Sequence, residues 1–574
     1  MSTLWHDLTV GDGLFGALAE SPQADAPTGP RTSWTLDSEA KQKVWAAFRP
    51  LLSSLDDASY STSLTPEMLD IAYEQYIVHH HSISPLIHLS SFCPRNAPVS
   101  LLVAMCTIGL SVMGTGDLNK LVSKIFPDLL RIASNDLHAS SAGDASLMRR
   151  LTAMMTGFLV LTLASVIGHK RRITQTESLY VSLLSNAHSD GLFSANEYSP
   201  SLVGLTSILS EERRWRVWGS IESVKRLILH LVQLDCWYSS YLAVDPTLRP
   251  ECVHIIPTCD EVLFQASTLD KWSRMRPDFG QMDYPVISAS YYSTPTPSMS
   301  FDMNSTLLML LQLRFAAAST ILDRAPRDNE SQFKLLPWKI FTEDARHRSL
   351  VNLTVDLARA ADAKDRSFDM NNAISWHAFC MMLGANLPLF ETAAGRSGPT
   401  TAAQALKDIS NWAFTSSARR SCIHAAHIFN LLLNRRVSDP VKLHSIIALF
   451  QASLVLGLYI FAIPTQDSTD LYNLYDDVDW ASLGSVGLSD LSEDIMQPGS
   501  TLTAATKFIL RGGGASLSDF MLTPGYTQAC KCWLHFASLM LGLGRWKSRS
   551  FSRILHVMCN NLSDMDPNNF DDGQ

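Results

Sequence analysis

Asp476, Asp477 and Asp479 form an acidic cluster that could hold a metal ion. Carboxylates that converge from one helix face can hold Mg2+ against a diphosphate, as in all-α terpene synthases, because Mg2+ prefers oxygen ligands. Here Trp480 occupies the next position, serine- and glycine-rich sequence follows, and no matching second aspartate motif is evident. The cluster is therefore interpreted as an acidic loop.

Histidine and cysteine pairs give weaker signals for metal binding. His424 and His427 are three residues apart and could ligate zinc from one helix face, but no third ligand lies nearby in the sequence. The three histidines at 79–81 are consecutive and so point to different faces of a helix, as do Cys530 and Cys532. We interpret residues 79–81 as a solvated helix end and predict no metal site.

The sequence also lacks the patterns of common enzymes. Arg511-Gly512-Gly513-Gly514 is glycine-rich but is not followed by the Lys-Ser/Thr pair of a phosphate loop. No arrangement of nucleophile, base and orienting group is evident, and no nucleotide-binding motif is found. We therefore expect no catalytic activity and no cofactor, with an all-α enzyme kept as an alternative.

The residues with the clearest spacing lie on one predicted helix that begins at Ser210. Its hydroxyl can accept from a backbone N–H of the first turn, which makes Ser210 a suitable N-cap. Trp215, Trp218 and Glu222 follow at i, i+3 and i+7 and so share one face. Glu222 precedes Arg226 by four residues, the favourable order for an ion pair. An apolar run follows, which predicts a buried scaffold helix rather than a catalytic site.

The chain as a whole is predicted to be an all-α, multi-helix protein. Its 574 residues exceed one ordinary domain, and apolar residues recur at helical period through most of it. The predicted divisions are a flexible N-terminal segment at 1–36, a helical domain at 37–278, a linker at 279–300, a C-terminal helical region packed on that domain at 301–563, and an acidic tail at 564–574.

Two uncharged runs, 151–168 and 445–466, raise a membrane-associated helical protein as a second alternative. The first run has basic clusters on both sides, which gives no orientation bias, and serine and threonine dilute it. Helices that are hydrophobic all round also occur in the cores of large soluble proteins. We therefore predict core helices and no membrane contact.

Charge and cysteine content narrow the class further. The chain has 46 lysines and arginines and 55 aspartates and glutamates, which gives a net charge of −9. This negative balance does not indicate binding to nucleic acid. Its ten cysteines have no disulfide-like spacing, and no signal peptide opens the chain. A reducing, intracellular compartment is expected.

Residues 210–272 resemble the core signature of the fungal transcription factor regulatory domain, or middle homology region, in the variant found in Cys2His2 zinc-finger regulators. That variant runs Trp-x2-Trp-x3-Glu-x2-Arg-Arg, an apolar run, Asp, Pro-Cys-x3-Leu-Trp-x-Ala and another Trp. The corresponding residues here are Trp215, Trp218, Glu222, Lys225, Arg226, Asp235, Pro257, Cys259, Leu263, Ala266 and Trp272. Lys225 replaces an arginine, Thr258 separates Pro257 from Cys259, and Phe264 replaces the tryptophan.

The resemblance extends from about Pro66 to Ala462. Residues 84–92 are similar to the family's Pro-Phe-x-His-x-Pro-Thr-Phe motif, with His88 at the histidine, and 101–109 to its Leu-Leu-x-Ala-x-Cys-x-x-Gly helix. Residues 191–193 match a Gly-Leu-Phe, and 417–428 and 452–459 resemble later helices. The domain at 37–278 is thus identified as the regulatory domain.

The resemblance implies a nuclear transcription regulator of a metabolic or biosynthetic gene set, such as one for secondary metabolism. Partners would be other transcription proteins, with a small-molecule effector and a homodimer left open. The family carries zinc fingers before this domain, yet no cysteine occurs before Cys93. We therefore expect this chain to reach DNA only through a partner or a missing N-terminal module. The signature residues are expected to be scaffold and not contacts with an inducer.

Overall fold

The structure is a computed structural model with side chains. It describes residues 14, 35–53, 64–141, 145–167, 173–195, 205, 208–242, 244–276, 286–288, 301–324, 336–362, 369–463, 471–490, 502–517, 520–521, 523–544 and 548–562. Within these ranges nearly all regular structure is helical, and the strands β1 to β5 have two to four residues each. The all-α prediction is confirmed.

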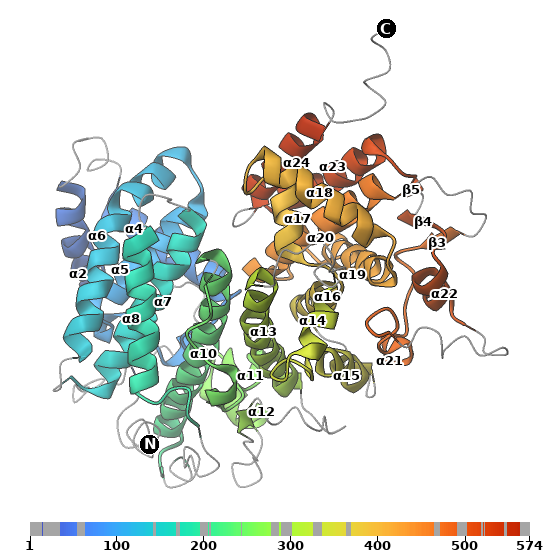
Figure 1. The fold of residues 1–574 in the computed structure, drawn as a ribbon. Helices are drawn as coiled ribbons and strands as arrows, with labels where there is room; N and C mark the ends of the chain where they lie inside the picture. Colours follow the sequence, from blue (N-terminus) through green and yellow to red (C-terminus); the bar gives the residue numbers. More distant parts are fainter. Residues whose placement is uncertain are drawn as a thin grey trace. The chain divides into compact units, whose positions relative to one another are not determined.

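The chain divides into two compact units (Figure 1). The first unit comprises Met1–Leu242 with Pro246–Tyr291, and the second comprises Ala243–Asp245 with Tyr292–Gln574. The division after Tyr291 falls inside the segment 279–300, for which a linker was predicted. That segment also contributes a strand, β2 (Ile287–Ser288), which pairs antiparallel with β1 (His254–Ile255). The finer domain boundaries stay a prediction.

The first unit is a helical bundle, coloured blue to green in Figure 1. Its helices are α2 (Ser38–Ser53), α4 (Pro66–Gln75), α5 (Val99–Met113), α6 (Gly116–Ser141), α7 (Leu147–Ile167), α8 (Ile173–Ser189), α10 (Glu211–Leu242), α11 (Glu261–Phe264) and α12 (Leu269–Met275). The π-helical turn η1 (Tyr76–His81) and the 3-10 turns η2 (Leu89–Ser91), η3 (Pro94–Asn96) and η5 (Pro250–Cys252) connect them.

Helix α5 lies at the centre of this bundle, in contact with α4, α6 and α7. It is apolar nearly all round, and ten consecutive residues from 101 to 110 are buried. Gly109 lets α4 approach closely, because a Cβ there would lie only 1.7 Å from the carbonyl oxygen of Ala72. The Cys106 thiol donates to the Leu69 carbonyl at 3.6 Å. The small residues of this motif therefore serve helix packing.

The histidines at 79–81 do not form the solvated helix end that the sequence suggested. His80 and His81 are only 3% and 4% exposed. His80 stacks on Tyr76, and His81 Nε2 lies 2.8 Å from the Ile87 carbonyl oxygen. Burial lowers the pKa of His80 to about 4 and of His81 to about 3. The prediction failed because η1 turns this end of the helix inward, which a sequence pattern of period 3.6 does not anticipate.

The second unit is a larger set of helices with a small sheet. Its helices are α13 (Phe301–Arg324), α14 (Pro337–Glu343), α15 (Leu350–Asp362), α16 (Met370–Gly384), α17 (Leu387–Ala393), α18 (Pro399–Ala413), α19 (Ser416–Leu433), α20 (Leu443–Ala462), α21 (Trp480–Leu483), α22 (Ala504–Arg511), α23 (Tyr526–Leu543) and α24 (Ser548–Leu562). Strand β4 (Gly514–Leu517) pairs parallel with β3 (Leu471–Asn473) and antiparallel with β5 (Phe520–Met521).

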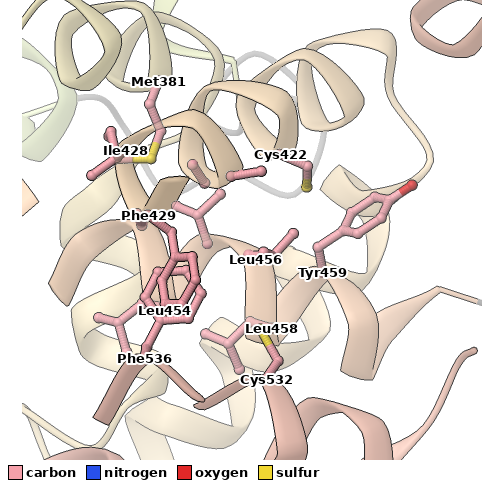
Figure 2. Packing of buried hydrophobic residues seen from close by; sticks show 14 of the residues in the cluster. Met381, Cys422, Ile428, Phe429, Leu454, Leu456, Leu458, Tyr459, Cys532 and Phe536 are labelled. Atoms are coloured by element: carbon pink, nitrogen blue, oxygen red, sulfur yellow. The ribbon is translucent and has the colours of Figure 1, made fainter. Parts of the chain in front are cut away.

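Helix α20 forms the core of this unit and is covered by α16, α19 and α23. Figure 2 shows Phe429 of α19, Leu454 of α20 and Phe536 of α23 converging there. The rings of Phe429 and Phe536 are 4.5 Å apart. These apolar contacts use almost the whole circumference of α20.

Three helices are long and apolar enough to cross a membrane by length and composition: Leu147–Ile167, Ser305–Leu322 and Leu443–Ala462. Within the described part of the chain, 72%, 44% and 78% of their apolar windows are already buried inside the fold. For the first and third helices, which carry the two uncharged runs singled out in the sequence, protein covers most of the apolar surface.

Candidate functional site

The signature residues gather around the middle of α10 and form what we call the signature cluster: Trp215, Trp218, Glu222, Lys225, Arg226, Cys259, Phe264 and Trp272, with His88 from the preceding motif. Ser210 caps α10 as predicted, because its hydroxyl accepts from the Arg213 N–H at 3.3 Å. Trp218 and Trp272 are 1% and 0% exposed, and their ring centroids lie 5.4 Å apart. The two tryptophans fix α12 against α10.

His88 joins the two motifs that the sequence analysis treated separately. Its ring lies 5.5 Å from the ring of Trp215, 5.6 Å from that of Trp218 and 5.4 Å from that of Phe264. Gly219 makes room for it, since a Cβ there would fall 2.3 Å from His88 Nδ1. The residue after Trp218 is thus required to be small, which the sequence signature alone did not reveal.

Polar contacts hold His88 in this position. Its backbone N–H donates to the Ser223 hydroxyl at 3.0 Å, and its Nδ1 lies 2.7 Å from the Ser91 hydroxyl. Burial lowers the pKa of His88 to about 3, with the positive charge of Arg226 as a second cause. A neutral, enclosed imidazole of this kind serves packing and is a poor proton donor near neutral pH.

The sequence predicted an ion pair between Glu222 and Arg226, but the partner of Glu222 is Lys225. The Lys225 Nζ lies 2.5 Å from Glu222 Oε1, and the two side chains are 3% and 1% exposed. The other carboxylate oxygen accepts from the Cys259 N–H at 2.9 Å, and Lys225 also donates to the Pro257 carbonyl at 2.8 Å. Both charges of this buried pair therefore also bind the backbone at 257–259.

Arg226 instead contacts the chain segment at residues 259–264. Its Nη1 lies 3.0 Å from Glu261 Oε2, and its Nη2 donates to the Cys259 carbonyl at 3.1 Å. The guanidinium lies 4.0 Å from the ring centroid of Phe264, at the position where the family has tryptophan. The spacing rule failed because a chain segment distant in sequence supplies a carboxylate that local periodicity cannot foresee.

Cys259 contributes its backbone and not its thiol. Its N–H and carbonyl bind Glu222 and Arg226, while its thiol donates to the Asp260 carbonyl at 3.5 Å. Burial raises the pKa of this thiol well above its usual value, with Glu222 as a further cause. A thiol held protonated in this way is not a nucleophile.

Asp235 anchors the chain beyond the end of α10. Its two oxygens accept from the backbone N–H groups of Thr247 and Leu248 at 3.0 and 2.8 Å, and the Tyr180 hydroxyl also donates to it. Burial raises its pKa in spite of these bonds. The carboxylate thus ties α8 and the turn after Pro246 to α10.

These contacts define what the signature cluster can do chemically. Each charged signature residue forms an ion pair with another side chain or hydrogen bonds with backbone groups. Within the described ranges, no group of three or more His, Cys, Asp or Glu side chains is arranged to hold a metal ion. The contacts of the cluster fix three segments against one helix, and the expectation that its residues are scaffold and not contacts with an inducer stays a prediction.

Two buried histidines and one half-buried histidine meet in the other unit. His424 and His427 of α19 meet His377 of α16, a residue for which the sequence pattern gives no signal. The Nδ1 atoms of His377 and His424 are 2.9 Å apart, and Trp480 stacks on His424 at 4.2 Å. Burial lowers the pKa of all three imidazoles. Only the i, i+3 spacing within α19 could have signalled this cluster.

The aspartates at 476–479 lie in the turn between β3 and α21. Asp476 accepts from the Asn473 side-chain amide at 2.9 Å, and Asp479 caps α21 by accepting from the Ser482 N–H at 2.9 Å. Asp476, Asp477 and Asp479 are exposed. The interpretation as an acidic loop agrees with this placement.

Comparison with known proteins shows what the chain is similar to. Residues 73–345 match the family model described as the fungal specific transcription factor domain. The chain is also similar to "Transcription factor PfmaH" of Pestalotiopsis fici (strain W106-1 / CGMCC3.15140), with 23% identity over 233 residues. That match covers 39% of this chain and 23% of the relative's own length. No solved structure matches the chain.

Proposed function

We propose that this chain, which matches the fungal specific transcription factor domain over residues 73–345, is a transcription regulator that acts in the nucleus to control a metabolic or biosynthetic gene set. Secondary metabolism is the favoured kind of gene set. The proposal rests on the similarity to the family and on one structural observation. The side chains of the signature form ion pairs, hydrogen bonds and ring contacts with other parts of the same unit. Such a domain acts through the surfaces that it presents and not through chemistry at its signature.

Binding is accordingly the proposed mechanism. The domain would present helical surfaces to other transcription proteins, and a small-molecule effector or a second copy would act by favouring one conformation over another. The net charge of −9 does not favour direct contact with the phosphate backbone. We propose that DNA is reached through a partner or through a module outside this sequence, and that the chain has no catalytic or membrane role.

Transcript profiling tests this proposal. The gene is deleted in its host and restored with the parent chain, with Trp218→Ala or with the exposed control Glu212→Ala. We expect the deletion and Trp218→Ala to change the transcripts of functionally related metabolic genes, and the parent and the control to restore them. Unchanged transcripts in the deletion strain under every growth condition that expresses the gene would contradict the proposal.

A further inference from the structure

We propose that Cys530 and Cys559 are a redox pair, and that a peroxide oxidant converts them into a disulfide that joins α23 to α24. Both cysteines belong to the second unit, and both are free thiols in the structure. The proposal goes beyond the regulatory function, because it assigns a modification site and does not depend on which genes are controlled.

Reciprocal contacts place the two cysteine residues side by side. Cys530 Sγ lies 3.8 Å from the carbonyl oxygen of Cys559, and Cys559 Sγ lies 3.8 Å from the carbonyl oxygen of Cys530. The Tyr526 hydroxyl, one turn before Cys530, also donates to the Cys559 carbonyl. Since each sulfur reaches the backbone of the other residue, the two residues are direct neighbours across the helix pair. A disulfide needs two cysteines whose Cα atoms are about 4.4–6.8 Å apart, so residues in direct contact of this kind are candidates for one.

The two thiols differ in solvent exposure, so they can take different roles in a stepwise oxidation. Cys530 is half-buried and can meet a small oxidant, whereas Cys559 is only 7% exposed. Burial, together with its neighbour Cys530, raises the pKa of Cys559 to about 12. Cys530 is therefore the attacking thiol and Cys559 the resolving one.

The reaction balances with hydrogen peroxide as the oxidant. The Cys530 thiol ionises, its thiolate attacks one peroxide oxygen, the O–O bond breaks, and the leaving hydroxide takes up the proton that the thiol released to become water. The resulting sulfenic acid is attacked by the sulfur of Cys559, the S–O bond breaks, and the second hydroxide takes the proton of Cys559. Two thiols and one peroxide thus give one disulfide and two waters. A dithiol reductant reverses the step by thiol–disulfide exchange.

The consequence follows from the position of α24. This helix packs on α23 and reaches α20 through Phe551, whose ring stacks on that of Phe450 at 4.5 Å. A bond between Cys530 and Cys559 would tie α24 to α23 and restrict its separation from the core of the second unit. Oxidation would thereby change how readily α24 opens while leaving the signature cluster untouched.

Mass spectrometry of the full chain tests the pair directly. The folded chain is treated with hydrogen peroxide, free thiols are blocked in denaturant, and peptides are compared with and without a dithiol reductant. We expect a peptide pair cross-linked between Cys530 and Cys559, two hydrogens lighter than the sum, that disappears on reduction. Peroxide-treated folded chain that lacks this cross-link, whether its thiols remain free, overoxidise or pair elsewhere, overturns the proposal.

Matched variants separate the pair from general oxidation. Cys530→Ser should abolish the cross-link, and Cys252→Ser, which removes an exposed cysteine of the other unit, should leave it intact. In the parent chain, peroxide should also raise the midpoint of unfolding for the second unit, and reduction should reverse the shift. A cross-link that forms only in chain already unfolded by urea would show that the folded geometry does not create it.

Discussion

Replacing Glu222 with alanine tests the polar contacts of the signature cluster by removing a single carboxylate. The change removes the carboxylate that pairs with Lys225 and accepts from the Cys259 N–H. Because the pair is at most 3% exposed, Lys225 would keep a buried charge without its carboxylate partner, although it would still donate to the Pro257 carbonyl. The backbone at 257–259 would lose one of its attachments to α10.

The magnitude follows from this burial. Removing one partner of a buried ion pair costs about 3–5 kcal/mol in the free energy of unfolding. The unsatisfied Cys259 N–H would add about 1–3 kcal/mol if water cannot reach it. Glu212 provides the matched control on the same helix, since it pairs with Arg216 while 58% exposed. Glu212→Ala should cost only about 0.3–0.5 kcal/mol.

Calorimetric melting of the full chain measures the difference. About 1 kcal/mol shifts the melting temperature of a domain of 150–250 residues by about 2–4 °C, so the loss of the ion pair alone, at about 3–5 kcal/mol, should make Glu222→Ala melt roughly 6–20 °C lower. The transition of the first unit is recognised because Trp218→Ala, which empties a fully buried site at a cost of about 3–5 kcal/mol, shifts it too. Equal melting temperatures for Glu222→Ala and Glu212→Ala would refute the reasoning.

Three further predictions concern other contacts. Gly219→Ala should lower the melting temperature, because its Cβ would fall 2.3 Å from His88 Nδ1, whereas Gly116→Ala, with nothing within 4 Å, should not. Tyr180→Phe should cost about 1–3 kcal/mol in chemical denaturation, because buried Asp235 loses a donor. Buried histidines such as His88, whose pKa falls to about 3, stay neutral in the fold but charge on unfolding. Stability should therefore be full above pH 6.5 and fall by up to about 1.4 kcal/mol per histidine for each pH unit below it, as urea titrations can show.

Local pattern was enough to predict that the chain is helical and that α10 is a buried helix. Capping by Ser210 and burial of Trp218 depend on residues within a few turns of one helix, which period and side-chain type report well. The apolar runs of α7 and α20 were likewise predicted as core helices, and most of their apolar surface is covered by protein.

Contacts between distant segments could not be predicted from the same patterns. The spacing of Glu222 and Arg226 suggested a pair, but the segment after Pro257 supplies Glu261 to the arginine and leaves Glu222 to Lys225. The packing of the His88 ring against Gly219 joins residues more than a hundred positions apart in the sequence. Spacing reports only neighbours on the same element, so partners brought by the fold stay hidden.

The meeting of His377 with His424 and His427 changes an expectation for one variant. Because the sequence predicts no metal site at His424 and His427, it gives no reason for His427→Ala to differ from the parent chain. In the structure, His427 stacks on His377 at 5.2 Å and contacts the edge of Trp480, so its loss should lower the melting temperature of the second unit. Asp476→Ala, in the exposed turn, should still melt like the parent.

Reporter transcription by a tethered chain decides most directly whether this protein regulates transcription through its own surfaces. The full chain is fused to an unrelated DNA-binding domain and recruited to a reporter promoter, with nuclear localisation and protein level checked. We expect the parent and Glu212→Ala to change reporter transcription several-fold, and Trp218→Ala to lose that effect. A folded, nuclear parent fusion that leaves the reporter unchanged in the host's own cells would contradict the proposed function.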